Sequence, residues 1–262
     1  PVLLAPGRGD AEGFGFDPDE LRRAFSPKTR LILLNTPHNP TGKVFTREEL
    51  ALVAELCLEH DVLAVTDEVY EHLVFEGHAH HPLAAFPGMA ERTLTVSSGG
   101  KTFSCTGWKI GWACGPAPLV AAVRTAKQFL TFVNGAPFQP AIAAGLRLGD
   151  SYFTRFAADL QAKRDLLGGY LDRAGFRVHP PEGTYFTTAD ITPVVERRGG
   201  DLPADSVGFC LALPHRAGVV AVPSSVFYTD PRDGRTLIRF CFAKNDTMLT
   251  DAGQRLIDAF AP

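Results

Sequence analysis

Short apolar runs alternate with amphipathic stretches along the first part of the chain. The run 31–35 predicts a buried strand, and 46–61 predicts an amphipathic helix. Thr46 and Glu49 form a capping box at the start of this helix. Its apolar positions at helical spacing are Leu50, Val53, Ala54 and Cys57. Further strands are predicted at 62–66, 93–96 and 112–114. Such alternation is typical of an α/β protein whose mostly parallel sheet is covered by helices.

The pattern changes after a long helical stretch, 151–174, that ends at Gly175. The charged, glycine-containing stretch 196–201 predicts a surface loop. The elements predicted beyond Gly175 are strands at 176–178, 184–188, 218–222 and 237–242, and a final helix at 250–260. We therefore expect two domains, with a mostly parallel sheet in 1–160 and a smaller α+β fold in 161–262.

Composition narrows the class of protein. The chain has 262 residues, of which 45% are apolar, and this is enough for a sizeable core. A net charge of −3 argues against a nucleic-acid binder. The apolar runs are too short to span a bilayer, and no secretory leader is visible. Five cysteines without CxxC spacing fit reduced thiols, so we expect a cytoplasmic protein without a membrane segment.

Three polar groups follow predicted strands, at 38–42, 67–70 and 98–101. In an open parallel sheet, ligands bind beyond the carboxyl ends of the strands. Each group alone has a plainer explanation: a turn for 38–42, a helix cap at Asp67, and a solvated lysine at Lys101. Their chemistry becomes informative only when the three are taken together.

Two other motifs are set aside. Gly100-Lys101-Thr102 resembles the end of a phosphate-binding P-loop, but that motif needs a glycine where Thr95 stands. The histidines of 78–81 resemble metal ligands, but no cysteine or carboxylate cluster completes a site, so a solvated loop is favoured. We expect no metal centre.

Five segments together carry a family resemblance. They are Asn-Thr-Pro-His-Asn-Pro-Thr-Gly (35–42), Asp-Glu-Val-Tyr (67–70), Ser-Ser-Gly-Gly-Lys-Thr-Phe-Ser-Cys-Thr-Gly-Trp-Lys-Ile-Gly-Trp (97–112), Gly-Thr-Tyr-Phe (183–186) and Ile-Arg-Phe-Cys-Phe (238–242). The chain resembles the fold-type I, class I/II aminotransferases that depend on pyridoxal phosphate. The most similar branch includes kynurenine, glutamine, methionine and N-succinyldiaminopimelate aminotransferases. The resemblance implies a large cofactor-binding domain and a small carboxyl-terminal domain.

The resemblance also assigns the catalytic residues. Lys101 matches the lysine that holds the cofactor as a Schiff base and then moves a proton at the substrate's alpha carbon. Asp67 matches the carboxylate beside the ring nitrogen, where an opposite charge moves a pKa by about 1–3 units toward the pyridinium. Tyr70 and Asn39 match the groups that hydrogen-bond the ring oxygen.

Further roles follow by the same comparison. Ser98 and Lys109 match contacts of the cofactor phosphate; many relatives have arginine at the second position, but the branch named above carries lysine. Arg239 matches the arginine that binds the substrate's alpha-carboxylate, and Tyr185 is a candidate for lining the site, although core packing explains it equally well. Phe132 lies where relatives offer an aromatic residue to the partner subunit.

The expected activity is amino-group transfer between an L-amino acid and a 2-oxo acid by a homodimer. A beta-lyase acting on cysteine conjugates and a non-catalytic relative stay open, as does the substrate side chain. The resemblance begins part way into the family's pattern, at Pro1. We therefore expect a missing amino-terminal segment, and weak cofactor retention and poor solubility for the isolated chain.

Overall fold

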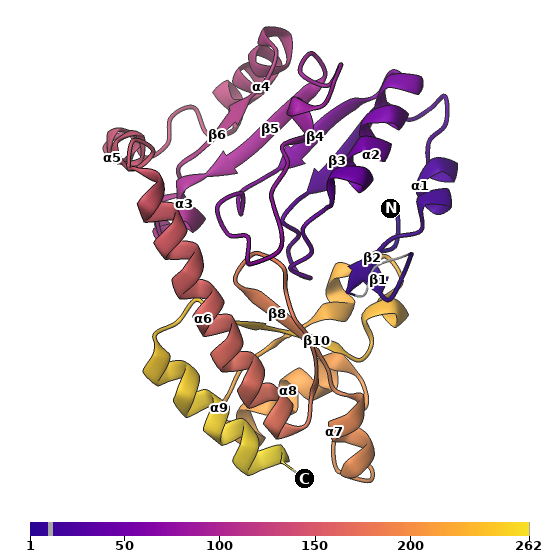
Figure 1. Cartoon of the computed structure of the whole chain (residues 1–262), viewed down its shortest axis with the longest axis vertical. Helices are drawn as coiled ribbons and strands as arrows, with labels where there is room; N and C mark the ends of the chain where they lie inside the picture. Colours follow the sequence, from indigo (N-terminus) through magenta and orange to yellow (C-terminus); the bar gives the residue numbers. More distant parts are fainter. Residues whose placement is uncertain (10–12, 262) are drawn as a thin grey trace. The chain divides into compact units, whose positions relative to one another are not determined.

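The computed structural model describes residues 1–9 and 13–261 and contains two compact units, which are treated separately below (Figure 1). The parallel-sheet unit comprises Pro18–Pro37 and Val44–Ala157. The antiparallel-sheet unit comprises Pro1–Asp17, His38–Lys43 and Ala158–Pro262. The chain thus enters the second unit more than once, and the division into domains 1–160 and 161–262 stays a prediction.

The parallel-sheet unit is built on a four-stranded sheet in the order β3-β4-β5-β6. β3 (Leu31–Asn35), β4 (Leu63–Asp67) and β5 (Thr93–Ser98) are parallel, whereas β6 (Gly111–Cys114) is antiparallel to β5. The four predicted strands are confirmed to within two residues at each end. Because β3, β4 and β5 run the same way, their carboxyl ends meet at one edge of the sheet.

Helices connect and cover these strands. The α-helices of this unit are α1 (Pro18–Ala24), α2 (Arg47–Glu59), α3 (Gly99–Thr102), α4 (Ala117–Leu130) and α5 (Phe138–Gly145), with short 3-10 helices η1 (Leu83–Ala85) and η2 (Thr106–Trp108). The predicted capping box is present, since Glu49 N donates to Thr46 Oγ1 at 3.2 Å and Thr46 N donates to Glu49 Oε2 at 2.8 Å. The predicted apolar face of α2 is buried, from Leu50 to Cys57.

The antiparallel-sheet unit contains a second four-stranded sheet, in the order β7-β8-β10-β9. Its strands are β7 (Arg177–His179), β8 (Phe186–Asp190), β9 (Val222–Pro223) and β10 (Leu237–Cys241), and β1 (Ala5–Pro6) pairs separately with β2 (Phe14–Gly15). Its helices are α6 (Asp150–Ala174, which begins in the other unit), α7 (Thr192–Arg197), α8 (Ser206–Ala217), α9 (Asp246–Phe260), η3 (Ser224–Phe227) and η4 (Pro231–Gly234). A cluster of aromatic rings forms part of its core, namely Phe176, Phe209, Phe240 and Phe260.

Two sequence predictions need correction here. The strand predicted at 218–222 is wrong except at Val222, because Gly218 (φ 65°) is the left-handed cap that ends α8. The loop predicted at 196–201 is surface, but its first two residues complete α7. Arg197 is held there because its Nη2 donates to the carbonyls of Ala174 and Phe260, both at 3.3 Å.

Two further observations concern the described residues as a whole. Among residues 1–9 and 13–261, no helix has the length and apolar character needed to cross a membrane. In the same part of the chain, no three His, Cys, Asp or Glu side chains are grouped as metal ligands would be. The five cysteines, all of them described, carry free thiols.

Candidate active site

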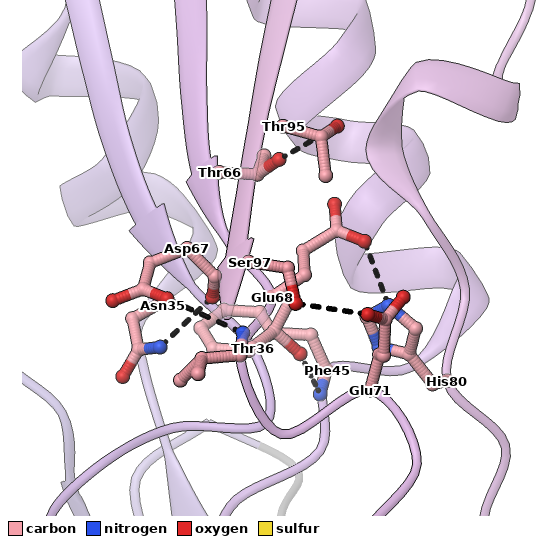
Figure 2. Close-up of polar contacts among 11 residues, drawn as sticks. Asn35, Thr36, Phe45, Thr66, Asp67, Glu68, Glu71, His80, Thr95 and Ser97 are labelled. Carbon is pink, nitrogen blue, oxygen red and sulfur yellow. Dashed lines mark hydrogen bonds and ion pairs between the residues drawn. The ribbon is translucent and has the colours of Figure 1, made fainter. Parts of the chain in front are cut away.

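Asp67 is the last residue of β4, at the carboxyl edge of the parallel-sheet unit. Its carbonyl accepts from Asn35 Nδ2 at 2.9 Å and from Thr36 N at 3.1 Å, which ties it to the end of β3 (Figure 2). Its carboxylate Oδ1 accepts from Val69 N at 3.3 Å, and the side chain is half-buried. The strand pairing and this local turn therefore fix the carboxylate at the sheet edge.

Tyr70 lies three residues beyond Asp67, in the turn that leaves β4. Its side chain is 2% exposed. The turn is closed by hydrogen bonds from Glu71 N to Glu68 O and from Leu73 N to Tyr70 O. The turn thus carries both predicted ring-contacting residues of this unit.

Lys101 lies in α3, the short helix that follows β5 directly. Its side chain is half-buried, and Gly99 and Gly100 before it are buried. A Cβ at Gly99 would stand 2.5 Å from Ile142 Cδ1 on α5, and one at Gly100 would stand 3.0 Å from Thr106 Cα. These glycines therefore allow α3 to pack closely against its neighbours, which places Lys101 beside the end of β5.

Ser98 and Lys109 both lie close to the point where the β5–β6 pairing ends. Ser98 pairs with Gly111, and Gly99 N donates to Ile110 O at 3.1 Å. Lys109 precedes Ile110 and adopts the left-handed conformation (φ 57°), with an exposed side chain. A hydroxyl and an ammonium group are thus available at the same end of the sheet as Lys101.

A cavity of about 630 Å³ lies beside Lys109 in the parallel-sheet unit. Its lining is mostly apolar and includes Trp112, Phe132 and Ile142, with Lys127 as a second cation. Phe132 is 71% exposed and has a φ of 56°.

Asn39 and Arg239 meet in the antiparallel-sheet unit, although 200 residues separate them. Arg239 Nη1 donates to Asn39 Oδ1 at 2.7 Å. The guanidinium carbon lies 4.0 Å from the centre of the Phe186 ring and 5.1 Å from that of Phe227. These cation–π contacts orient the plane of the guanidinium. Tyr185 lies beside this group, half-buried, with its ring 4.6 Å from that of Phe186.

The segment His38–Lys43 holds Asn39 against this sheet. Glu182 N and Gly183 N both donate to Gly42 O, at 3.0 and 2.9 Å. Gly42 has a φ of 75°, and a Cβ there would stand 2.2 Å from Pro181 Cβ, so this position requires glycine. Burial, together with the charge of Lys43, lowers the pKa of His38 from 6.5 to about 4.

The sequence interpretation missed a buried polar contact near the site. His80, placed in a solvated loop with its neighbours, is 9% exposed, and its Nε2 lies 2.8 Å from Glu68 Oε2 (Figure 2). His78 is exposed, as expected. The sequence gives no local sign of this contact, because it depends on the return of the histidine segment to the end of β4. The aromatic contacts of Arg239 were also missed.

Comparison with known proteins defines the family. A sequence model of aminotransferases of class I and II matches residues 8–256, and the chain therefore belongs to this family. Members use pyridoxal 5'-phosphate. The α/β fold of the chain is accordingly the fold-type I fold of these transferases.

Relatives of known name show how much of such a protein the chain represents. A probable N-succinyldiaminopimelate aminotransferase of Mycobacterium tuberculosis is 50% identical over 97% of this chain. A solved structure of N-succinyldiaminopimelate aminotransferase from Mycobacterium tuberculosis matches 96% of the present chain, with a TM-score of 0.89 and 49% identity. The match covers 64% of the chain in that solved structure. Kynurenine–oxoglutarate transaminase 3 of Mus musculus is 41% identical over 94% of the chain and 56% of its own length. The chain spans 64% of the Mycobacterium tuberculosis relative.

Proposed function

We propose that the chain is the cofactor- and substrate-binding part of a pyridoxal-phosphate-dependent aminotransferase. The observation that carries the proposal is that Asp67 and Lys101 directly follow two neighbouring parallel strands, β4 and β5, at one edge of one compact unit. This edge is where an open parallel sheet binds its ligands. The reaction is transfer of an amino group between an L-amino acid and a 2-oxo acid.

The residues present fit the cofactor. A carboxylate, an amine, a hydroxyl and an ammonium group stand at the same edge of the sheet, from Asp67, Lys101, Ser98 and Lys109. The carboxylate complements a basic ring nitrogen, and the amine complements a carbonyl carbon. The hydroxyl and the ammonium group complement a phosphate. The close packing at Gly99 and Gly100 keeps α3 and its lysine in place beside them.

When bound, the cofactor supplies an electron-withdrawing ring that stabilises negative charge at the substrate's alpha carbon. Asp67 would keep a proton on the ring nitrogen by its opposite charge. Tyr70 would donate a hydrogen bond to the ring oxygen, and Asn39 is proposed as a further donor to it. The Lys101 amine would hold the cofactor and would carry a proton to and from the alpha carbon. Ser98 and Lys109 would bind the phosphate, the lysine as a point charge.

Arg239 binds the substrate's alpha-carboxylate. A planar guanidinium and a carboxylate form two parallel hydrogen bonds, which orient the substrate as well as hold it. The Phe186 and Phe227 rings and the bond to Asn39 fix the guanidinium plane before substrate arrives. Tyr185, whose ring contacts that of Phe186, is proposed as a further residue that lines the substrate site.

The proposal includes a homodimer in the cytoplasm. Large apolar side chains are exposed at the end of α4 and just beyond it, namely Phe129, Leu130, Phe132 and Val133. An exposed apolar stretch of this kind marks a protein interface. A second copy of the chain is the proposed partner, and light scattering measures the mass directly. The five free thiols support a reducing compartment.

An amino-acid panel tests the activity. The names of the relatives suggest N-succinyl-diaminopimelate and kynurenine as donors, with 2-oxoglutarate as acceptor. We expect turnover that requires the acceptor and is lost in Lys101→Ala and strongly reduced in Asp67→Asn. Ammonia release without any 2-oxo acid would instead indicate a beta-lyase. No turnover of any donor by a chain that carries the cofactor would contradict the proposal.

A further inference from the structure

Glu68 and His80 form a buried polar pair next to the proposed cofactor site. Glu68 Oε2 and His80 Nε2 are 2.8 Å apart, and the two side chains are 1% and 9% exposed. Figure 2 shows Glu68 extending from the end of β4 toward His80, on the side away from Asp67. The pair joins the turn after β4 to a segment that lies 12 residues further along the chain.

Within the part of the chain that the structure describes, each side chain of the pair has a second polar atom that makes no hydrogen bond. Among the described residues, Glu68 Oε1 and His80 Nδ1 are buried and have no hydrogen-bond partner. A buried carboxylate loses the hydration that stabilises it in water, and a paired donor is what offsets that loss. The single contact with His80 is therefore the principal side-chain interaction of Glu68 in this unit.

Glu68 stands within the turn that presents Asp67 and Tyr70. Its own N–H donates to Val96 O at 2.8 Å, which extends the parallel pairing beyond the last residue of β4. Its carbonyl accepts from Glu71 N at 2.9 Å. Glu71 Oε1 in turn accepts from Ser97 Oγ at 2.9 Å (Figure 2). The turn is thus anchored by side-chain contacts on the side away from Asp67 (Figure 2).

We propose that Glu68 and His80 are positioning residues that hold the 67–70 turn, and through it the Asp67 carboxylate and the Tyr70 phenol. Neither residue touches the reacting atoms. The role of Asp67 and Tyr70 toward the cofactor rests on the proposed function. The anchoring of the turn itself does not, and it can be measured without cofactor.

Native-state hydrogen exchange on the 262-residue chain tests the anchoring. The amides of Glu68, Glu71 and Leu73 are hydrogen-bonded and report on the turn, and those of α2 report on the rest of the unit. We expect His80→Leu to speed exchange of the turn amides by about 10- to 100-fold relative to α2, the factor set by losing a hydrogen bond to a charged group. His80→Gln, whose amide can donate from the position of Nε2, should stay within about threefold of the parent.

Two variants complete the design. His78→Ala removes an exposed imidazole from the same segment and should leave the turn amides unchanged. Glu68→Gln keeps the side-chain volume and should speed turn exchange by about 3- to 10-fold, since a neutral hydrogen bond is roughly half as strong as a charged one. Glu68→Gln provides the test of the anchoring if His80→Leu does not fold. Equal acceleration of the turn and α2, or no acceleration of the turn, would overturn the proposal.

Cofactor titration then links the anchoring to the site. We expect His80→Leu to weaken pyridoxal phosphate binding by about tenfold or more, the size typical when a partner that orients a binding side chain is removed. His80→Gln should restore it to within about threefold. Parent chain that does not bind at Lys101 would refute the proposed function and leave the exchange result to decide the anchoring. Normal binding by a His80→Leu chain with a loosened turn would overturn the link.

Discussion

Replacing Gly99 by alanine should disturb the packing that positions Lys101. The new Cβ would stand 2.5 Å from Ile142 Cδ1 and 3.0 Å from its Cγ2, and Ile142 is only 4% exposed. Overpacking of this kind costs about 1–3 kcal/mol. The higher helix propensity of alanine adds up to about 1 kcal/mol of unfolding free energy relative to glycine. The clash is the larger effect, so we expect a net loss of about 1–2 kcal/mol of unfolding free energy.

The assay is urea unfolding followed by tryptophan fluorescence. Both tryptophans of the chain, Trp108 and Trp112, lie in the parallel-sheet unit, so the signal reports on the unit that contains Gly99. Gly107→Ala is the matched control, because a Cβ there meets nothing within 4 Å. It should be neutral or slightly stabilising.

A second substitution at Ile142 identifies the cause. Ile142→Val removes Cδ1, the atom nearest to the new Cβ, and should by itself cost about 1 kcal/mol. The double variant Gly99→Ala/Ile142→Val should lose about 1 kcal/mol less unfolding free energy than the sum of the two single losses. The reason is that removing Cδ1 relieves the clash with the new Cβ. Strictly additive losses, or a Gly99→Ala chain as stable as Gly107→Ala, would refute the packing argument.

Three further substitutions test the cap of α2, the burial of His38 and the aromatic contacts of Arg239. Thr46→Ala removes the cap of α2 and should lower the unfolding free energy by about 1 kcal/mol in the same fluorescence assay, whereas an unchanged midpoint would show that the cap is unimportant. Because the pKa of His38 is lowered to about 4, the unfolded chain takes up its proton first, and stability falls as the pH drops from 6.5 toward 4. His38→Gln should flatten this part of the stability–pH profile, and an identical profile would contradict that assignment. Phe227→Leu removes one ring beside Arg239 and should raise KM for the amino acid about two- to fivefold with little change in kcat, whereas a fall in kcat alone would argue against carboxylate binding.

The fold of the parallel-sheet unit was largely predictable from local pattern. The strands β3, β4 and β5 are short apolar runs between turns, and the capping box of α2 is a local signal that needs no tertiary context. The antiparallel direction of β6 was not predictable, because a strand has the same pattern in either direction. The run after Gly218 was misread as a strand because apolar residues also follow a helix cap, and Val220 there is 77% exposed.

The candidate site was predictable where its residues end strands, and less so where partners are distant in sequence. Asp67 and Lys101 were singled out because they follow predicted strands, and the family resemblance then assigned their roles. The structure places them after two neighbouring parallel strands. The hydrogen bond between Asn39 and Arg239 was not predicted, since no periodicity of the sequence relates two side chains in different elements. The burial of His80 depends on the return of its segment to β4. A loop of histidines gives no local sign of such a return.

The lysine to which pyridoxal phosphate attaches shows directly whether this edge of the sheet is the cofactor site. Purified protein would be mixed with pyridoxal phosphate, reduced with borohydride and mapped by peptide mass, with Lys101→Ala and Lys109→Ala as controls. With pyridoxal phosphate in excess, we expect a visible absorbance band and, after reduction, label on Lys101 and on no other lysine; this label should be absent from Lys101→Ala and weaker in Lys109→Ala. Label spread over surface lysines, or equal labelling of Lys101→Ala, would contradict the assignment of this edge of the sheet as the cofactor site.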